Sequence, residues 1–281
     1  MVKRSSPVCI PNSEVLALHS KSADQEYRIP IALPMDYAES QDRYPVLYVL
    51  DADTAYGFAF VTYLVRSVPF LRTLSFLGQD PFVTNVPRLI VVGIGYPTSL
   101  YDRPRVWWNL RMRDQTPTSN PDDARKVGLE RTYGGNAEKA LRFIRKELMP
   151  YVNANYRTDP EDSTIVGHSG GGLFALYVLF REPETFRRYV VSSPSMWWDK
   201  KVIFNYEREY ASKHADLPAK LFLSVGSLEE GMVTNLKELA GVLKQRKYRR
   251  LEWESHVFEE ETHLSVGHPA IFRGITSVFA K

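Results

Sequence analysis

Several features that would restrict the function are scarce or missing in this sequence. Cys9 is the only cysteine, so no disulfide can form within the chain. No apolar run reaches about eighteen residues, the length that a membrane-spanning helix needs. The basic residues near the start are not followed by an apolar stretch, which argues against a secretory signal. We therefore expect a cytoplasmic protein with no membrane association.

An excess of charge of one sign is also missing. The chain has 36 Lys and Arg residues against 33 Asp and Glu residues, a formal net charge of +3 over 281 residues. This balance does not favour nucleic-acid binding. The sequence has no H-E-x-x-H pattern, no glycine-rich dinucleotide motif after a strand and no P-loop. We expect no metal and no cofactor, and we leave the oligomeric state open.

The chain does contain an alternation of short β-rich runs and longer runs with helical periodicity, which is typical of α/β folds. Eight strands are expected, at 14–20, 26–34, 45–51, 88–96, 163–169, 188–193, 220–227 and 251–259. The first two alternate polar and apolar residues, which predicts an antiparallel hairpin at the sheet edge. The runs IVVGIG and LFLSVG are nearly all apolar, which predicts central strands that are buried on both faces.

Helices are expected at 135–156, with a kink or end at Pro150, and at 171–182, 235–247 and 268–280. The segment 96–131 is rich in proline and arginine and shows no clear period, so it is interpreted as a long functional loop over one end of the sheet. No repeat or linker interrupts the pattern. We predict one α/β domain over residues 1–281, with helices on both faces of a mostly parallel, twisted sheet.

The stretch Val166–Gly172 places a serine among glycines, between a strand and an apolar helix. Gly167, Ser169 and Gly171 match the pattern G-x-S-x-G. A strand-to-helix turn this tight strains the serine backbone and projects its hydroxyl from the sheet edge. The free N–H groups of the first helical turn then face the reaction centre and stabilise negative charge. The motif predicts a nucleophile at Ser169, with a structural glycine turn as the alternative.

A serine hydroxyl is a weak nucleophile, so this prediction requires a base and an acid. His263 lies in the loop after the last expected strand and is the candidate base, whereas His268 is expected to cap the last helix or lie on the surface. His168 adjoins the serine but points away from it and is expected to pack beside the sheet. In the string GSLEEG after the seventh strand, Glu229 is preferred as the acid, with Glu230 as the alternative.

Seven stretches along the chain together resemble one family. They are VLYVLDAD, RMRDQTP, YGGNAEKALRFIRKELMPYVNANYRTD, IVGHSGGGLFALYVLF, VVSSPSMWWD, VGSLEE and ETHLSV. From about Tyr44 onward the chain resembles the esterase D-like branch of the α/β-hydrolases, and especially the enterobactin and bacillibactin (siderophore) esterases. This resemblance implies a serine carboxylesterase with an α/β-hydrolase fold and a catalytic triad of Ser169, His263 and Glu229.

The resemblance also implies an oxyanion hole. Its donors are the N–H of Gly170 and one N–H from the turn after the third strand, Ala52 or Asp53. That turn usually contains L-D-G-x, and Ala52 here replaces the glycine, so a positive φ angle becomes less favourable.

Substrate-binding candidates come from the loops around the expected cleft. They are Trp197, Trp198, Arg113 and Trp107, whose rings and charge suit an anionic aromatic acyl group. Packing of these rings beneath the loop is the alternative. A siderophore trilactone is the leading substrate hypothesis, and a feruloyl or acetyl esterase, an acyltransferase and a non-catalytic binding protein with the same fold are the other possibilities.

Overall fold

The fold is built on one mixed sheet. The structure is a computed structural model that describes residues 9–71, 73–74, 85–129 and 132–280. The strands are β1 Ser13–Ser20, β2 Gln25–Ala32, β3 Tyr44–Leu50, β4 Ile90–Ile94, β5 Thr158–His168, β6 Arg188–Ser192, β7 Asp216–Gly226 and β8 Arg249–Phe258. They are arranged in the order β1-β2-β4-β3-β5-β6-β7-β8. All eight predicted strands are present, although β5 and β7 begin five and four residues earlier than predicted.

The strand directions also agree with the sequence pattern. β1 pairs antiparallel with β2, β2 pairs antiparallel with β4, and the remaining neighbours are parallel. The parallel strands β3, β4 and β6 are almost entirely buried, and β5 and β7 are buried over their carboxyl-terminal halves, as their apolar runs predict. The first two strands form the predicted antiparallel hairpin at one edge.

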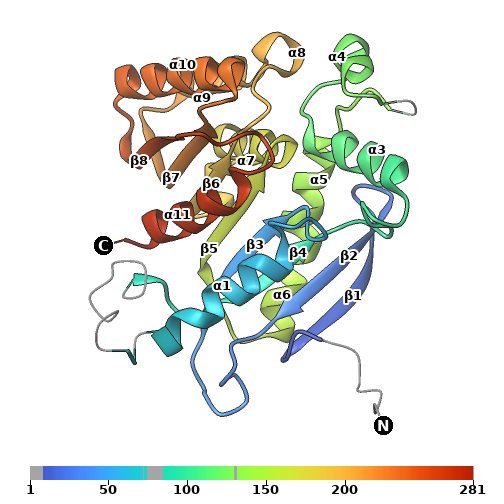
Figure 1. Cartoon of the computed structure of the whole chain (residues 1–281), viewed down its shortest axis with the longest axis vertical. Coiled ribbons are helices and arrows are strands. Elements are labelled where there is room, and N and C mark those ends of the chain that lie inside the picture. Colours follow the sequence, from blue (N-terminus) through green and yellow to red (C-terminus); the bar gives the residue numbers. More distant parts are fainter. Residues whose placement is uncertain (1–8, 72, 75–84, 130–131, 281) are drawn as a thin grey trace.

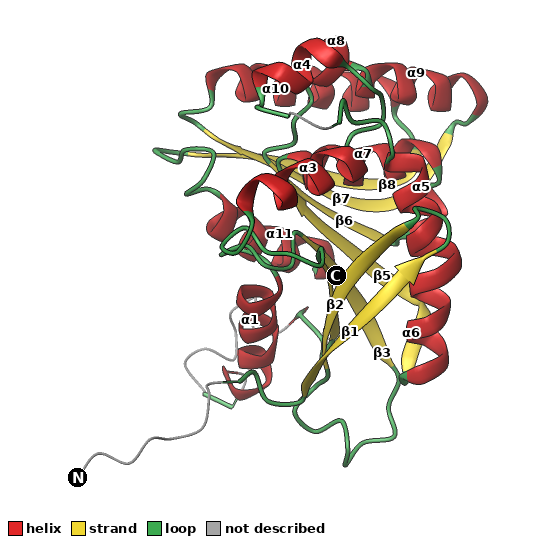
Figure 2. Ribbon diagram, turned by 90° about the vertical axis from the view of Figure 1, so that its right-hand side faces the viewer, coloured by secondary structure: helices red, strands yellow, loops and turns green. Residues whose placement is uncertain are grey.

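Helices cover both faces of the sheet (Figures 1 and 2). One face packs against α1 Phe58–Leu71 and α11 Gly267–Phe279. The other face packs against α3 Pro104–Gln115, α5 Ala137–Phe143, α6 Met149–Asn155, α7 Gly170–Arg181, α9 Ile203–Lys213 and α10 Glu230–Arg246. Two short helices, α4 Pro121–Lys126 and α8 Trp198–Lys201, lie beyond the carboxyl ends of the strands. This is the three-layer α/β-hydrolase architecture that we expected.

The segment 96–131 is not the long loop that we predicted. It contains α3 and α4, and α3 buries Trp107, Arg111, Met112, Asp114 and Gln115. Three of these five buried side chains are polar or charged and find partners inside the protein. A buried helix is normally recognised in a sequence by the regular spacing of its apolar residues. Because polar residues occupy buried positions of α3, this spacing is not visible there.

The predicted helix 135–156 is locally distorted before its proline. A π-helical turn, η1 Ile144–Leu148, separates α5 from α6, and the N–H of Met149 donates to Ile144 O. Pro150 follows within the first turn of α6, where its missing N–H costs little. The chain therefore stays helical through the proline and changes its hydrogen-bond spacing just before it.

The sheet brings distant segments to one edge. The parallel strands β3, β5 and β7 end at Leu50, His168 and Gly226. The carboxyl ends of parallel strands meet at the same edge of a sheet, where open α/β folds bind their ligands. The residues that follow these three strands therefore gather in one place.

Candidate active site

Ser169 lies at the sharp turn between β5 and α7, with φ 60° and ψ −118°. This left-handed conformation is costly for a residue other than glycine. The segment after β6 holds both backbone groups of the serine. Ser169 N–H donates to Ser192 O at 2.9 Å, and Ser195 N–H donates to Ser169 O at 3.0 Å. These two bonds keep the strained residue in place.

Two glycines of this turn, Gly167 and Gly172, are required by close backbone contacts. A Cβ atom on Gly167 would lie 2.2 Å from the carbonyl oxygen of Gly171. A Cβ atom on Gly172 would lie 3.0 Å from the carbonyl oxygen of Ser192 and 3.0 Å from the Cα of Pro194. The turn can approach α7 and the segment after β6 this closely only because side chains are missing at these positions.

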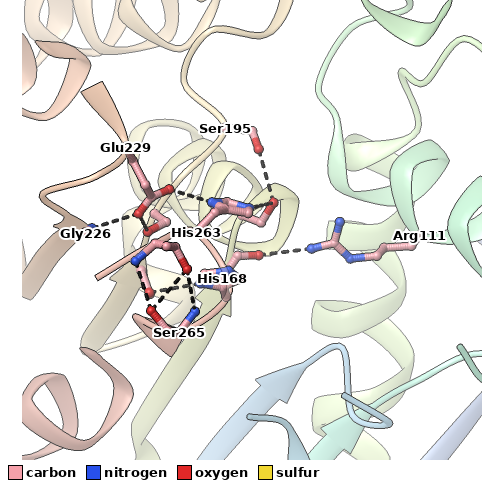
Figure 3. A network of polar contacts seen from close by, with 11 residues as sticks. Arg111, His168, Ser195, Gly226, Glu229, His263 and Ser265 are labelled. Atoms are coloured by element: carbon pink, nitrogen blue, oxygen red, sulfur yellow. Dashed lines mark hydrogen bonds and ion pairs between the residues drawn. The ribbon is translucent and has the colours of Figure 1, made fainter. Parts of the chain in front are cut away.

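The three residues proposed as a triad from the sequence are in contact. Ser169 Oγ lies 3.0 Å from His263 Nε2, and His263 Nδ1 lies 2.6 Å from Glu229 Oε2. The side chain of His263 is 36% exposed and that of Glu229 is 5% exposed. Figure 3 shows Glu229 and His263 in one network of polar contacts. The geometry is that of a nucleophile, a base and a buried group that orients the base.

The carboxylate of Glu229 has three donors. Its Oε1 accepts the N–H of Gly226 at 2.7 Å and the hydroxyl of Ser193 at 2.7 Å, while Oε2 faces His263. Burial raises the pKa of Glu229, but the hydrogen bonds from His263, Ser193 and Gly226 outweigh burial, and the net pKa is lowered. Glu229 is therefore ionised, and the proton between it and His263 belongs to Nδ1.

The alternative candidates for the acid and the base lie elsewhere. Glu230 is exposed at the start of α10, and His268 Nε2 lies 3.2 Å from Ala55 O. His168 is buried beside the sheet, as predicted, with Nδ1 at 3.0 Å from Ser192 Oγ and its ring centroid 4.8 Å from that of His263. Burial, followed by the charges of His263 and Arg111, lowers the pKa of His168 well below its usual value. His168 is therefore neutral.

The candidate oxyanion donors are not equivalent. Gly170 begins α7, so its N–H is one of the free donors of the first helical turn. The N–H of Ala52 donates to Ile94 O at 3.2 Å and is engaged within the fold. Asp53, the next residue in the turn, is left as the candidate for the second donor.

The comparisons with known proteins agree with this fold and show the family. Residues 113–268, more than half of the chain, match the Esterase family, described as "Putative esterase". The ferri-bacillibactin esterase BesA of Bacillus subtilis is 33% identical over 270 residues, which cover 93% of this chain and 88% of that protein. The chain belongs to this esterase family.

Two further relatives span almost the full length of the chain. The siderophore triacetylfusarinine C esterase of Aspergillus fumigatus is 28% identical and covers 99% of this chain and 97% of its own length. The crystal structure of the BES protein from Bacillus cereus superimposes with a TM-score of 0.80 at 29% identity, over 99% of this chain and 98% of that one. The chain is a carboxylic ester hydrolase with an α/β-hydrolase fold.

Arg111 is a buried residue of α3 that contacts two turns of the candidate site. Its Nη2 donates to the carbonyl oxygen of His168 at 3.1 Å, and its Nε and Nη2 both bind Asp51, which directly follows β3 and has a positive φ of 53°. Gln115 Nε2 donates to Asp51 Oδ1 at 2.7 Å. One buried guanidinium thus links the turn after β3 to the turn that contains Ser169.

The carboxyl of Asp53 lies near this charge network. Burial, followed by the charge of Asp51, raises the pKa of Asp53 to about 6. Ionised Asp53 would place a second negative charge beside Asp51 at the candidate oxyanion turn.

The four predicted substrate-binding residues have different environments. Trp107 is 3% exposed, and Trp198 is fully buried with its Nε1–H donating to Thr118 O at 3.0 Å. Arg113 Nε and Nη2 donate to Asp114 at 2.7 and 3.1 Å. Trp197 is half-buried, and its ring lies beside that of Trp198 with the two centroids 6.0 Å apart. Packing beneath the loops, the alternative to substrate contact, accounts for Trp107 and Trp198.

The sequence analysis did not identify three residues that contact this machinery. They are Ser193 and Ser195, which follow β6, and Arg111, which belongs to the arginine-rich segment 96–131 but was not expected to pair with Asp51 or to contact His168. The string SSPS at 192–195 was visible in the sequence, but serines are common in loops and carry no spacing signal of their own.

Two negative findings concern the described part of the chain. No group of three or more His, Cys, Asp or Glu side chains there is arranged to hold a metal ion. None of the helices described has both the length and the apolar character needed to cross a membrane.

Proposed function

We propose that this esterase hydrolyses its substrate through an acyl-enzyme on Ser169. The observation that carries the proposal is the contact series from Ser169 Oγ through the imidazole of His263 to the carboxylate of Glu229. In the first step, Ser169 Oγ attacks the ester carbonyl while His263 Nε2 takes its proton, and Glu229 stabilises the imidazolium. The alcohol then leaves with that proton.

The tetrahedral oxyanion requires donors opposite the base. We assign this role to the N–H of Gly170 and, as the second donor, to the N–H of Asp53. Removing one such donor typically costs about 2.7–4 kcal/mol of transition-state stabilisation. In the second step, water attacks the acyl-enzyme by the same route, His263 takes the water proton, and the acid is released as Ser169 regains a proton.

A comparison of the wild-type protein with Ser169→Ala tests this proposal. Hydrolysis of p-nitrophenyl butyrate should be lost in the variant, and mass spectrometry of the quenched wild-type reaction should show an acyl group on the peptide that contains Ser169. Equal activity in the two proteins would refute the nucleophile assignment.

We further propose a siderophore ester as the substrate class. The support is that two relatives matched over 93% and 99% of the chain are named as esterases of ferri-bacillibactin and of triacetylfusarinine C. Trp197, half-buried beyond β6, is the candidate for contact with an aromatic acyl group.

The substrate class is tested by comparing the hydrolysis rates of several esters. The protein is incubated with ferric and iron-free trilactone siderophores, with a feruloyl ester and with an acetylated sugar, and kcat/KM is measured for each. A higher value for the trilactones supports the siderophore assignment. Equal or higher values for the feruloyl or acetyl ester would replace it with that alternative. Product analysis with added alcohol tests the acyltransferase alternative.

A further inference from the structure

The segment Ser192–Ser195 begins with the last residue of β6 and contacts His168, Glu229 and Ser169. Ser192 Oγ lies 3.0 Å from His168 Nδ1, and Ser193 Oγ donates to Glu229 Oε1 at 2.7 Å. Ser195 Oγ lies 3.4 Å from Ser169 Oγ, the reacting atom itself. Ser195 is thus a second hydroxyl at the reaction centre.

The protonation of Glu229 and His263 decides which serine is the donor in the contact between Ser195 Oγ and Ser169 Oγ. Glu229 is ionised, so Nδ1 of His263 carries a proton and Nε2 is the acceptor. The hydroxyl of Ser169 therefore donates to His263. The proton between the two serines must then come from Ser195, whose side chain is buried and whose one hydroxyl contact among the described residues is Ser169 Oγ.

Ser195 approaches on the side away from the expected oxyanion hole. Its backbone N–H donates to the carbonyl oxygen of Ser169 at 3.0 Å. The peptide between Ser169 and Gly170 is trans, so its C=O and the Gly170 N–H point in opposite directions. The Ser195 hydroxyl is therefore placed to act on the oxygen of Ser169 and not on the carbonyl oxygen of the substrate. Figure 3 shows Ser195 in the same network as His263 and Glu229.

We propose that Ser195 is a catalytic residue of the deacylation step, where its hydroxyl donates a hydrogen bond to Ser169 Oγ as that atom leaves. This inference rests on the proposed acyl-enzyme at Ser169. In that step, water adds to the acyl carbonyl and gives a proton to His263. The C–Oγ bond of the tetrahedral intermediate then breaks, its electron pair goes to Ser169 Oγ, and His263 returns the proton to that oxygen.

The two half-reactions differ in their starting states. In the free enzyme, Ser169 Oγ is a hydroxyl that already accepts from Ser195, so this bond is present before acylation begins. In the acyl-enzyme, the same atom is an ester oxygen, which is a poor acceptor, and the bond regains strength only as the C–Oγ bond breaks. An interaction accelerates a step only where it is stronger in the transition state than in the ground state. Ser195 therefore assists deacylation more than acylation.

The experiment is stopped-flow hydrolysis of p-nitrophenyl acetate by the full chain. The burst of p-nitrophenolate gives the acylation rate constant and the later linear phase gives the deacylation rate constant. For Ser195→Ala we expect deacylation to slow by about three- to tenfold, the range that an ordinary hydrogen bond supports, with a smaller change in acylation. In steady state, kcat and KM fall together while kcat/KM changes less. A parallel loss of both rate constants, or no loss in deacylation, would overturn the inference.

Ser193→Ala is the matched control in the same segment. Ser193 acts through Glu229 and His263, which serve both half-reactions, so both rate constants should fall by the same factor. If Ser193→Ala shows the selective loss as well, the selectivity does not come from the contact with Ser169, and the inference fails.

Hydroxylamine as the attacking nucleophile distinguishes assistance to the leaving group from positioning of water. It should show the same loss in Ser195→Ala, because Ser169 is still the leaving group. Full rescue would mean that Ser195 positions water, which contradicts the inference.

The variant Ser169→Ala must show no burst. A burst in that variant would refute the proposed function itself. An inactive Ser169→Ala with parallel losses of both rate constants in Ser195→Ala refutes only the role of Ser195.

Discussion

Arg111 and Asp51 form a bidentate ion pair that is almost completely buried. Nε lies 2.9 Å from Oδ1 and Nη2 lies 2.8 Å from Oδ2, and the side chains are 2% and 1% exposed. The pair joins α3 to the turn after β3, and Arg111 also contacts His168, the residue before Ser169. Removing one partner of such a pair leaves the other charge buried without compensation.

We therefore expect Arg111→Met to lower the free energy of unfolding by about 3–5 kcal/mol. Urea unfolding followed by circular dichroism measures this change. The matched control is Arg142→Met, because Arg142 pairs with Glu138 across one exposed helical turn and should cost at most about 0.5 kcal/mol. Equal losses in the two variants would contradict the importance of the buried pair.

The choice between the two neighbouring glutamates is testable by exchange of the carboxylate for an amide. Glu229→Gln removes the charge that faces His263 Nδ1, and kcat should fall by at least about a hundredfold. Glu230→Gln alters an exposed side chain and should leave kcat within about twofold of wild type. The rates are measured with p-nitrophenyl butyrate at pH 7. The opposite ranking would transfer the role to Glu230.

Gly167, two residues before Ser169, should not tolerate a methyl group. Gly167→Ala would place Cβ 2.2 Å from a backbone oxygen that has no room to move, so we expect a loss of about 3 kcal/mol or more, or no folded protein. Gly241→Ala is the control, because no heavy atom outside the adjoining backbone of α10 lies within 4 Å of its Cβ position. That variant should gain up to about 1 kcal/mol. Thermal unfolding of both proteins gives the comparison.

Asp53 predicts a specific dependence of stability on pH. Its pKa is raised to about 6 in the folded protein, so the folded state holds this proton at pH values where the unfolded chain has released it. The contribution of Asp53 to stability is therefore fully present below about pH 4 and is lost as the pH rises through about 6. Asp53→Asn cannot lose a proton and lacks this decline.

Urea unfolding at several pH values tests the sign. The stability of Asp53→Asn relative to wild type should rise by about 1–2 kcal/mol between pH 4 and pH 7, a figure already reduced for partial exposure to water. Asp122→Asn, at a carboxyl that is 80% exposed on α4, should show no such rise. A flat difference for Asp53→Asn would mean that its carboxyl ionises normally.

The sequence predicted the fold through patterns that are local or periodic. All eight strands and the hairpin at the edge follow from local patterns. A strand buried on one face alternates polar and apolar residues, and a strand buried on both faces is a continuous apolar run. The prediction for segment 96–131 was wrong because α3 buries charged residues, and the partner of Arg111 is 60 positions away in the chain. No local pattern shows where such a charge is neutralised.

The order of the chain by itself determined which residue types follow β5, β7 and β8, and therefore that Ser169, Glu229 and His263 were candidates for one site. Only the tertiary structure decided the distances between their atoms, the engagement of the Ala52 N–H with Ile94 and the placement of Ser195 against Ser169. The physical reason is that strand order and helix packing fix such distances. A hydroxyl or an N–H acquires its partner only when segments that are far apart in sequence are brought together in the folded protein.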